Sequence, residues 1–291
     1  MTPSTLPPLP AAELELLDQH FPERTLALAH GRQAVREAGA ADAPALVCLH
    51  GIGSGAASWL GVARTLAPQA RLIAWDAPGY GVSSPLLASA PRAADYAARL
   101  AELLQALDIR RCVLVGHSLG ALVAGAAARP DSALRERIAR LVLVSPARGY
   151  GGAGREPQAR QVRTQRLAAL AEGGIAGMAG QRADRLLSAD ADATARQWVR
   201  WNMGRLNEGG YRQAIELLCG DDLLAALPPA MPVRVLCGAE DVVTPPAACR
   251  DVAAACGVGL EELPGAGHAC YVEQPGTVAR ALLQELHKAT A

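Results

Sequence analysis

The sequence lacks an excess of either charge. Its 291 residues contain 28 Lys and Arg against 28 Asp and Glu, so the formal net charge is zero, and the basic residues form no continuous stripe. A protein that binds nucleic acid or an anionic membrane surface needs such a positive region. We therefore expect neither a nucleic-acid partner nor a membrane partner.

The sequence also lacks paired cysteines and an export signal. The seven cysteines are odd in number and have no C-x-x-C spacing, and several fall within expected strands or helices, among them Cys48, Cys112, Cys237 and Cys249. Buried free cysteines are typical of a reducing compartment. Residues 1–10 are proline-rich and have neither the basic nor the apolar region of a signal peptide. These features predict a cytoplasmic protein.

Two other kinds of site are excluded by what is missing. The glycine loop 51–55 is not followed by Gly-Lys-Ser or Gly-Lys-Thr, which excludes a nucleotide-binding phosphate loop. The apolar stretch 112–128 has 17 residues, interrupted by His117 and Ser118. Since a membrane span needs ~20 apolar residues, this stretch is expected to lie in a protein core instead.

What the sequence does contain is an alternation of expected strands and helices. Its length favours one α/β domain with an insertion over two equal domains. Buried strands are expected at 45–50, 71–75, from 112, at 141–145, 233–238 and 258–263, after a hairpin of short strands at 25–30 and 32–36. Helices are expected at 58–66, 91–107, 245–255 and 275–288. This order predicts an α/β fold, with a mostly parallel sheet covered by helices on both faces.

Residues 147–224 have a different pattern. The strands stop, the charge rises, and helical periodicity appears at 158–171, 175–187, 192–206 and 211–218. We interpret this segment as a helical cap inserted after the sixth strand. The expected domains are therefore a core, residues 1–146 and 225–291, and a cap, residues 147–224.

The most informative stretch is Gly116-His117-Ser118-Leu119-Gly120, where a strand gives way to a helix within about four residues. It matches the Gly-x-Ser-x-Gly pattern of a nucleophile elbow, in which a strained turn exposes the serine hydroxyl. Gly116 and Gly120, two residues before and after the serine, have no side chain and so allow the strand and the helix to approach closely at this turn. The pattern predicts that Ser118 is a nucleophile.

A serine nucleophile needs a base, and the base needs an acid to orient it. Of the six histidines, His268 lies in a loop just after the last expected strand, and His50 is expected to organise the glycine loop instead. The loop after 233–238 offers Glu240 and Asp241 as the acid. Asp241 is preferred because it lies deeper in the turn, although a shift of one residue would select Glu240.

Two backbone N–H groups are needed to hold an oxyanion. Leu119, directly after the nucleophile, and Ile52, in the glycine loop, are expected to supply them. Specificity is expected to reside in the cap and its borders. Five residues are candidate substrate contacts, although each could instead belong to the core: Tyr150, Trp198, Trp201, Met203 and Tyr271.

Together these motifs resemble the α/β-hydrolase superfamily. The residues that carry the resemblance span nearly the whole chain in family order: 50–53 (His-Gly-Ile-Gly), 76–83 (Asp-Ala-Pro-Gly-Tyr-Gly-Val-Ser), 116–120, 238–241 and 265–268. The resemblance implies an eight-stranded, mostly parallel sheet, a helical cap after the sixth strand, and two-step hydrolysis through an acyl-enzyme. It implies neither a metal nor an organic cofactor.

Within the superfamily, the chain is similar to a small bacterial group of carboxylesterases, enol-lactonases and carbon–carbon bond hydrolases. The last of these typically have a Trp just after the catalytic His, whereas His268 is followed by Ala269 and Cys270. This difference favours a small carboxylic ester or lactone as substrate. A carbon–carbon hydrolase or thioesterase remains the alternative, with a non-catalytic binding protein further behind, and the chain could be a monomer or a homodimer.

Overall fold

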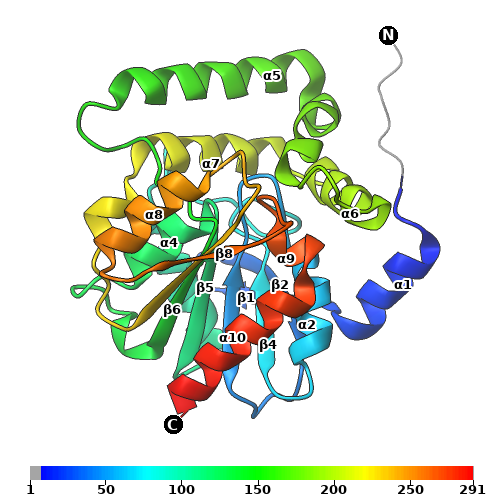
Figure 1. Ribbon diagram of the computed structural model, residues 1–291, viewed down its shortest axis with the longest axis vertical. Helices are drawn as coiled ribbons and strands as arrows, with labels where there is room; N and C mark the ends of the chain where they lie inside the picture. Colours follow the sequence, from blue (N-terminus) through cyan, green and yellow to red (C-terminus); the bar gives the residue numbers. More distant parts are fainter. Residues whose placement is uncertain (1–7, 291) are drawn as a thin grey trace.

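Eight strands form one sheet at the centre of the computed structural model, which describes residues 8–290 (Figure 1). In sheet order the strands are β1 (Glu23–Leu28), β2 (Gly31–Ala38), β4 (Arg71–Trp75), β3 (Ala45–Leu49), β5 (Cys112–His117), β6 (Ile138–Val144), β7 (Val233–Gly238) and β8 (Leu260–Leu263). β2 pairs antiparallel with both β1 and β4, and the remaining pairs are parallel. This topology confirms the prediction of an eight-stranded, mostly parallel sheet.

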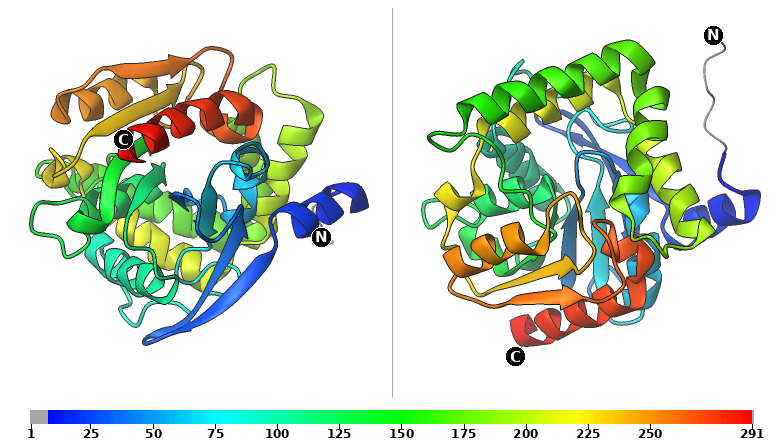
Figure 2. Two further views of the ribbon diagram at one scale, coloured as in Figure 1. Left: turned by 90° about the horizontal axis from the view of Figure 1, so that it is seen from below. Right: turned by 45° about the horizontal axis from the view of Figure 1, so that its top comes forward.

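The central strands are the continuous apolar runs of the sequence. Every residue of β3 and β5 is buried, as expected for strands covered on both faces, whereas the edge strand β1 has only exposed and half-buried residues. Two layers of helices provide the cover (Figure 2). One face carries α2 (Leu60–Leu66) and α10 (Pro275–Thr290), and the other carries α3 (Ala93–Ala106), α4 (Gly120–Ala127) and α8 (Pro246–Ala255).

Between β6 and β7 the chain forms a helical layer above the sheet (Figure 1). Its elements are α5 (Glu156–Arg182), η3 (Ala183–Leu186), α6 (Ala193–Gly204), α7 (Glu208–Gly220) and η4 (Leu223–Ala226). We call residues 147–224 the cap. The two helices expected at 158–171 and 175–187 correspond to the two halves of α5, which are separated by a break at Gly174, where φ is +58°.

Short elements make up the rest of the described chain: α1 (Ala11–His20), η1 (Ala56–Trp59), η2 (Arg135–Arg137) and α9 (Cys270–Glu273). The sequence did not indicate α9, because a single turn has no periodicity. Within residues 8–290, no helix combines the length and the apolar character that crossing a membrane requires.

Candidate active site

Ser118 lies at the turn between β5 and α4. Its φ is +51°, a left-handed conformation that a non-glycine residue adopts only under strain. A Cβ on Gly120 would lie 2.4 Å from the Leu49 carbonyl oxygen, and a Cβ on Gly116 would lie 2.8 Å from Ala121 Cα. Both glycines are therefore required by close backbone approach, and the turn has the strained geometry that the sequence pattern predicts.

His268 and Asp241 meet at the carboxyl ends of β7 and β8. His268 Nδ1 lies 2.8 Å from Asp241 Oδ2, and both side chains are almost fully buried. A Cβ on Gly238 would lie 2.1 Å from the Gly267 carbonyl oxygen, so that glycine lets the two loops come together. Glu240, the other possible acid, is exposed.

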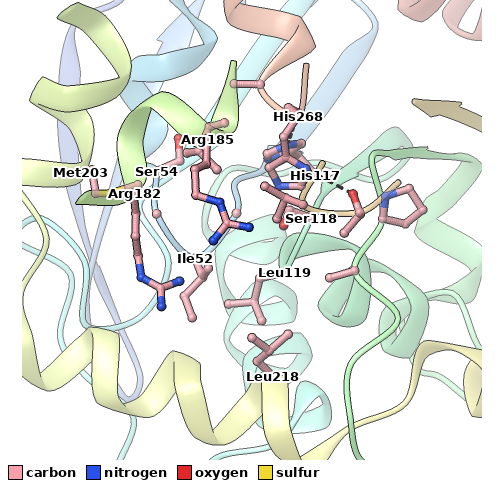
Figure 3. Close-up of a pocket in the computed structure, with 18 of the residues that line it drawn as sticks. Ile52, Ser54, His117, Ser118, Leu119, Arg182, Arg185, Met203, Leu218 and His268 are labelled. Carbon is pink, nitrogen blue, oxygen red and sulfur yellow. Dashed lines mark hydrogen bonds between the residues drawn. The ribbon is translucent and has the colours of Figure 1, made fainter. Parts of the chain in front are cut away.

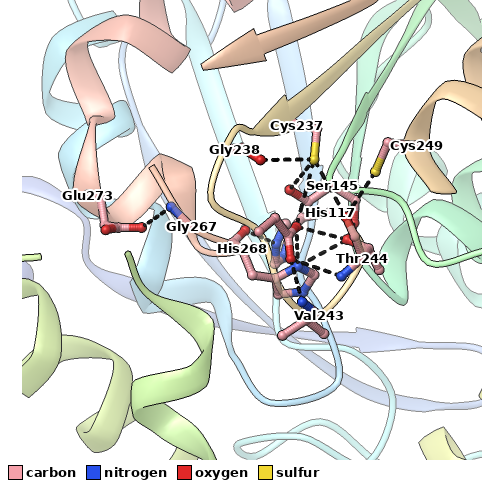
Figure 4. A network of polar contacts seen from close by, with 11 residues as sticks. His117, Ser145, Cys237, Gly238, Val243, Thr244, Cys249, Gly267, His268 and Glu273 are labelled. Atoms are coloured by element: carbon pink, nitrogen blue, oxygen red, sulfur yellow. Dashed lines mark hydrogen bonds and ion pairs between the residues drawn. The ribbon is translucent and has the colours of Figure 1, made fainter. Parts of the chain in front are cut away.

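Asp241 is held as a charged acceptor. Its Oδ1 accepts hydrogen bonds from the N–H groups of Val243 (2.8 Å) and Thr244 (2.9 Å), and its Oδ2 accepts one from the Thr244 hydroxyl (2.9 Å) (Figure 4). Burial raises the pKa of Asp241, but the attraction of His268 and these hydrogen bonds outweigh it and lower the pKa to about 2. An ionised Asp241 requires a proton on His268 Nδ1, which leaves Nε2 free to act as an acceptor.

Ser118 and His268 line the same cavity of about 350 Å³, on the cap side of the sheet (Figure 3). The hydrogen bonds recorded within residues 8–290 do not include one between the two side chains. Catalytic serine–histidine contacts are often long in unliganded enzymes and tighten when substrate binds. The structure thus brings Ser118, His268 and Asp241 to one site, with the serine and the imidazole facing a common space.

The two predicted oxyanion donors also border this cavity. Ile52 and Leu119 are lining residues, and within the described chain neither backbone N–H donates to another backbone or side-chain group. The Tyr80 hydroxyl donates to the Ile52 carbonyl oxygen at 2.9 Å, which anchors the peptide that follows the proposed donor. Both N–H groups are therefore available to a ligand.

The histidines beside the site have structural contacts. His50 Nε2 accepts the Ala77 N–H at 3.0 Å, so its Nδ1 donates to the Gly51 carbonyl oxygen at 2.8 Å. His117 donates from Nε2 to the His268 carbonyl oxygen at 3.0 Å. Burial lowers the pKa of both rings, and the nearby His268 lowers that of His117 further, so both are neutral. His50 organises the glycine loop, as expected.

The five candidate substrate contacts divide into two groups. Tyr150, Met203 and Tyr271 line the cavity, whereas Trp198 and Trp201 do not. The Trp198 indole donates to Glu13 of α1 at 3.0 Å, and the Trp201 ring packs against Trp198 and Arg205. The other side of α6 faces the cavity, and a substrate contact by these two tryptophans stays a prediction that the cavity lining does not support.

Tyr271 lines the cavity with its hydroxyl already engaged. That hydroxyl lies 3.0 Å from Ser54 Oγ and 3.2 Å from Ser58 Oγ, and the ring stacks on Trp59 at 4.2 Å. Burial is the main reason that the pKa of Tyr271 rises to about 12. Tyr271 is therefore a neutral wall of the cavity.

Sequence reasoning missed five arginines that line the cavity from the cap: Arg148, Arg155, Arg166, Arg182 and Arg185. The rise in charge after residue 146 was their only signal, and it did not say which way each side chain points. As for metals, residues 8–290 contain no group of three or more His, Cys, Asp or Glu side chains placed to hold an ion.

The chain is similar to known proteins in sequence and in fold. A model of the "Alpha/beta hydrolase family" matches residues 46–281. An uncharacterized protein of Mycobacterium bovis is 41% identical over 117 residues, which are 40% of this chain but only 33% of that protein. This chain thus matches about a third of that relative's length.

Two other similar proteins cover most of this chain. The "Putative carbamate hydrolase RutD" of Klebsiella pneumoniae (strain 342) is 30% identical over 251 residues, 81% of this chain and 88% of that protein. The crystal structure of the enol-lactonase from Burkholderia xenovorans LB400 covers 91% of this chain and all of its own, with a TM-score of 0.80 at 22% identity. The family match and the sheet topology together show that the chain belongs to the alpha/beta hydrolase family.

Proposed function

We propose that this protein is a serine hydrolase that cleaves a small carboxylic ester or lactone through an acyl-enzyme. The observation that carries the proposal is the convergence on one cavity of three features. These are Ser118 in its strained turn, the hydrogen-bonded pair His268–Asp241, and the free N–H groups of Ile52 and Leu119. Each feature supplies one requirement of acyl transfer: nucleophile, base with its orienting acid, and oxyanion donors.

In the first step, Ser118 Oγ attacks the substrate carbonyl carbon while its proton passes to His268 Nε2. The carbonyl oxygen becomes an oxyanion, which accepts hydrogen bonds from Ile52 and Leu119. Asp241 stabilises the imidazolium through its bond to Nδ1. Cleavage of the ester C–O bond follows, and the imidazolium gives its proton to the leaving alkoxide.

In the second step, water replaces the alcohol. His268 Nε2 takes a proton from the water as it attacks the acyl carbon, and then returns that proton to Ser118 Oγ as the acid departs. In a lactone, alcohol and acid remain in one molecule. The mechanism assigns a small molecule as the partner, and it uses neither a metal nor an organic cofactor.

The test is a substrate panel with a nucleophile variant. We expect wild-type protein to hydrolyse some p-nitrophenyl esters of graded acyl length or some lactones, and Ser118→Ala to lower kcat/KM by about a thousandfold or more. Ser89→Ala is the matched control, because Ser89 is exposed and is not a lining residue of the cavity. Full turnover by Ser118→Ala on every ester cleaved by wild type would overturn the proposal.

The same panel distinguishes the alternatives. A thioester, a vinylogous diketone and a carbamate are added because each is open to attack by the same serine, and because one relative is named as a carbamate hydrolase. A kcat/KM that is highest for the diketone would favour the carbon–carbon hydrolase. Absence of turnover on the whole panel would favour a binding protein that retains the site without using it.

A further inference from the structure

The cap side of the cavity is strongly basic. Five arginines line it, and among residues 8–290 no Asp or Glu does. Although the formal net charge of the chain is zero, the cavity that Ser118 lines therefore has a local excess of positive charge. Arg166 and Arg182 are half-buried and Arg185 is exposed, so these like charges repel one another across a partly solvated cavity.

Two of the five arginines have partners within the protein. Arg148 pairs with Asp222 at 3.2 Å, and the Arg155 guanidinium lies 4.8 Å from the centre of the Tyr150 ring. The other three are Arg166, Arg182 and Arg185, for which no ion pair with a carboxylate is recorded within the described chain. Only Arg166 has a polar side-chain contact, to the Tyr211 hydroxyl at 2.8 Å.

These three arginines come from two halves of a broken helix and the turn that follows it. Arg166 lies before the break at Gly174, Arg182 ends α5, and Arg185 lies in η3. Gly174 has φ +58°, and no atom lies within 4 Å of where its Cβ would be. The break turns the second half of α5, so side chains 16 and 19 positions apart reach one cavity.

The three charges act on one another. Burial lowers the pKa of Arg182, and the like charges of Arg166 and Arg185 lower it further. Figure 3 shows the guanidinium groups of Arg182 and Arg185 directed into the cavity that Ile52, Ser118 and His268 border. An anion placed between these groups would remove the repulsion and accept several charge-assisted hydrogen bonds, which guanidinium groups make with oxyanions in bidentate form.

We propose that the substrate is an ester or a lactone that also has an anionic group, which we expect to be a carboxylate. Arg182 and Arg185, together with Arg166, bind this anionic group. The scissile carbonyl then lies at Ser118, at the other end of the same small molecule. A cavity of about 350 Å³ accommodates a molecule of this kind. The inference rests on the proposed function, since it assumes that the carbonyl end of the ligand reacts with Ser118.

A matched pair of substrates tests the proposal. Mono-p-nitrophenyl adipate and p-nitrophenyl hexanoate have six-carbon acyl chains and differ in whether the far end is a carboxylate or a methyl group. We expect wild-type kcat/KM to be at least about tenfold higher for the adipate ester. Arg182→Gln and Arg185→Gln should each lower that value by about tenfold, mainly through KM, with less than a twofold change for the hexanoate ester.

Arg160→Gln is the matched control, because Arg160 is an exposed residue of the same helix and does not line the cavity. This variant should leave kcat/KM unchanged for both esters. Raising the salt concentration should reduce the advantage of the adipate ester in wild type, as screening weakens the attraction. If wild type prefers the hexanoate ester, or if both arginine variants lower kcat/KM equally for the two esters, the proposed anion site is wrong, although the proposed ester hydrolysis is unaffected.

A binding experiment separates this inference from the proposed function. Calorimetric titration of Ser118→Ala with adipate, and separately with inorganic phosphate, measures the anion site without turnover. If adipate binds more tightly, the anionic group of the substrate is a carboxylate; if phosphate binds more tightly, it is a phosphate. In either case, adding Arg182→Gln to Ser118→Ala should weaken binding about tenfold. Failure of both anions to bind would overturn the inference, whereas binding without any Ser118-dependent hydrolysis would overturn the proposed function alone.

Discussion

At the scale of single residues, the site is defined by how completely Asp241 is held. Its carboxylate accepts two backbone N–H groups, one hydroxyl and the His268 imidazole. A buried carboxylate with this many donors is stable as an anion. The same bonds fix which imidazole nitrogen carries the proton, so Asp241 orients the base.

The low pKa of Asp241 predicts a pH-dependent contribution to stability. A carboxylate with a pKa of about 2 in the folded state and 3.8 in the unfolded state stabilises the fold above pH 3.8, and this stabilisation is lost as the pH falls through 2. Urea unfolding should therefore show that the difference in free energy of unfolding between wild type and Asp241→Asn is about 1 kcal/mol smaller at pH 3 than at pH 6. A constant difference would mean that the Asp241 carboxylate is not stabilised by folding.

Residues with a local motif could be placed from the sequence, and residues without one could not. Ser118 lies in a short pattern whose geometry follows from its glycines, and Asp241 and His268 follow strands in an order that the fold dictates. The direction of a side chain on a cap helix depends on packing against other elements, so Arg182 could not be placed in the cavity, or Trp198 outside it, before the structure was known.

At the scale of elements, the turn between β5 and α4 depends on close backbone approach. Adding a Cβ to Gly120 would bring it within 3 Å of three backbone atoms of residues 49 and 50, none of which belongs to a flexible side chain. Gly120→Ala should lower the free energy of unfolding by about 2 kcal/mol and reduce kcat, because the turn that carries Ser118 must shift.

Gly180→Ala is the matched control for the elbow glycine. Gly180 lies in α5, is exposed, and has no atom within 4 Å of the added Cβ. The substitution should raise the free energy of unfolding by about 0.5 kcal/mol, because alanine is the better helix former. Urea titrations of both variants measure the contrast, and equal effects would contradict the steric argument.

Helix α6 presents different residues to its two sides. Val199, Asn202 and Met203 line the cavity, while Trp201 packs on the outer side. Met203→Ala should shift the preferred acyl chain to greater length by about fivefold in relative kcat/KM, because it enlarges the cavity. Trp201→Ala should leave that preference unchanged and lower the free energy of unfolding by about 2 kcal/mol. A change in chain-length preference in Trp201→Ala would restore it as a substrate contact.

The elements themselves were predicted well where their periodicity is long. All eight strands were expected within a few residues of their observed bounds. For the buried strands the reason is that apolar runs bounded by turn residues are a strong signal, whereas the exposed hairpin of β1 and β2 has a weaker one. The break in α5 at Gly174 lies between the two helices expected there, since a glycine pair normally ends a helix.

At the scale of the whole molecule, the last helix is fixed to the sheet by buried charge. Glu285 of α10 is almost fully buried and pairs with Arg140 of β6, Arg234 of β7 and Lys288. Burial raises the pKa of Glu285, but the hydrogen bonds from Lys288 and Arg140 outweigh it, so the pKa is lowered. The carboxylate thus connects an element at the end of the chain to two central strands.

Removing this charge should destabilise the fold without affecting the site. Glu285→Gln should lower the free energy of unfolding by about 2 kcal/mol, because Arg140 and Arg234 remain partly buried with less compensation. Glu208→Gln breaks only an exposed pair with Arg212 and should change stability by less than about 0.5 kcal/mol. Urea unfolding measures both, with kcat expected to stay at the wild-type value.

The cap is joined directly to the loop that carries the imidazole. The Ala269 N–H donates to the Leu186 carbonyl oxygen of η3 at 2.7 Å, and Glu273 accepts the N–H groups of both Ser188 and Gly267. Any displacement of η3 therefore pulls on the residue next to His268. A substitution or ligand that crowds or loosens this corner of the cap should therefore change kcat even when it never touches the reacting atoms.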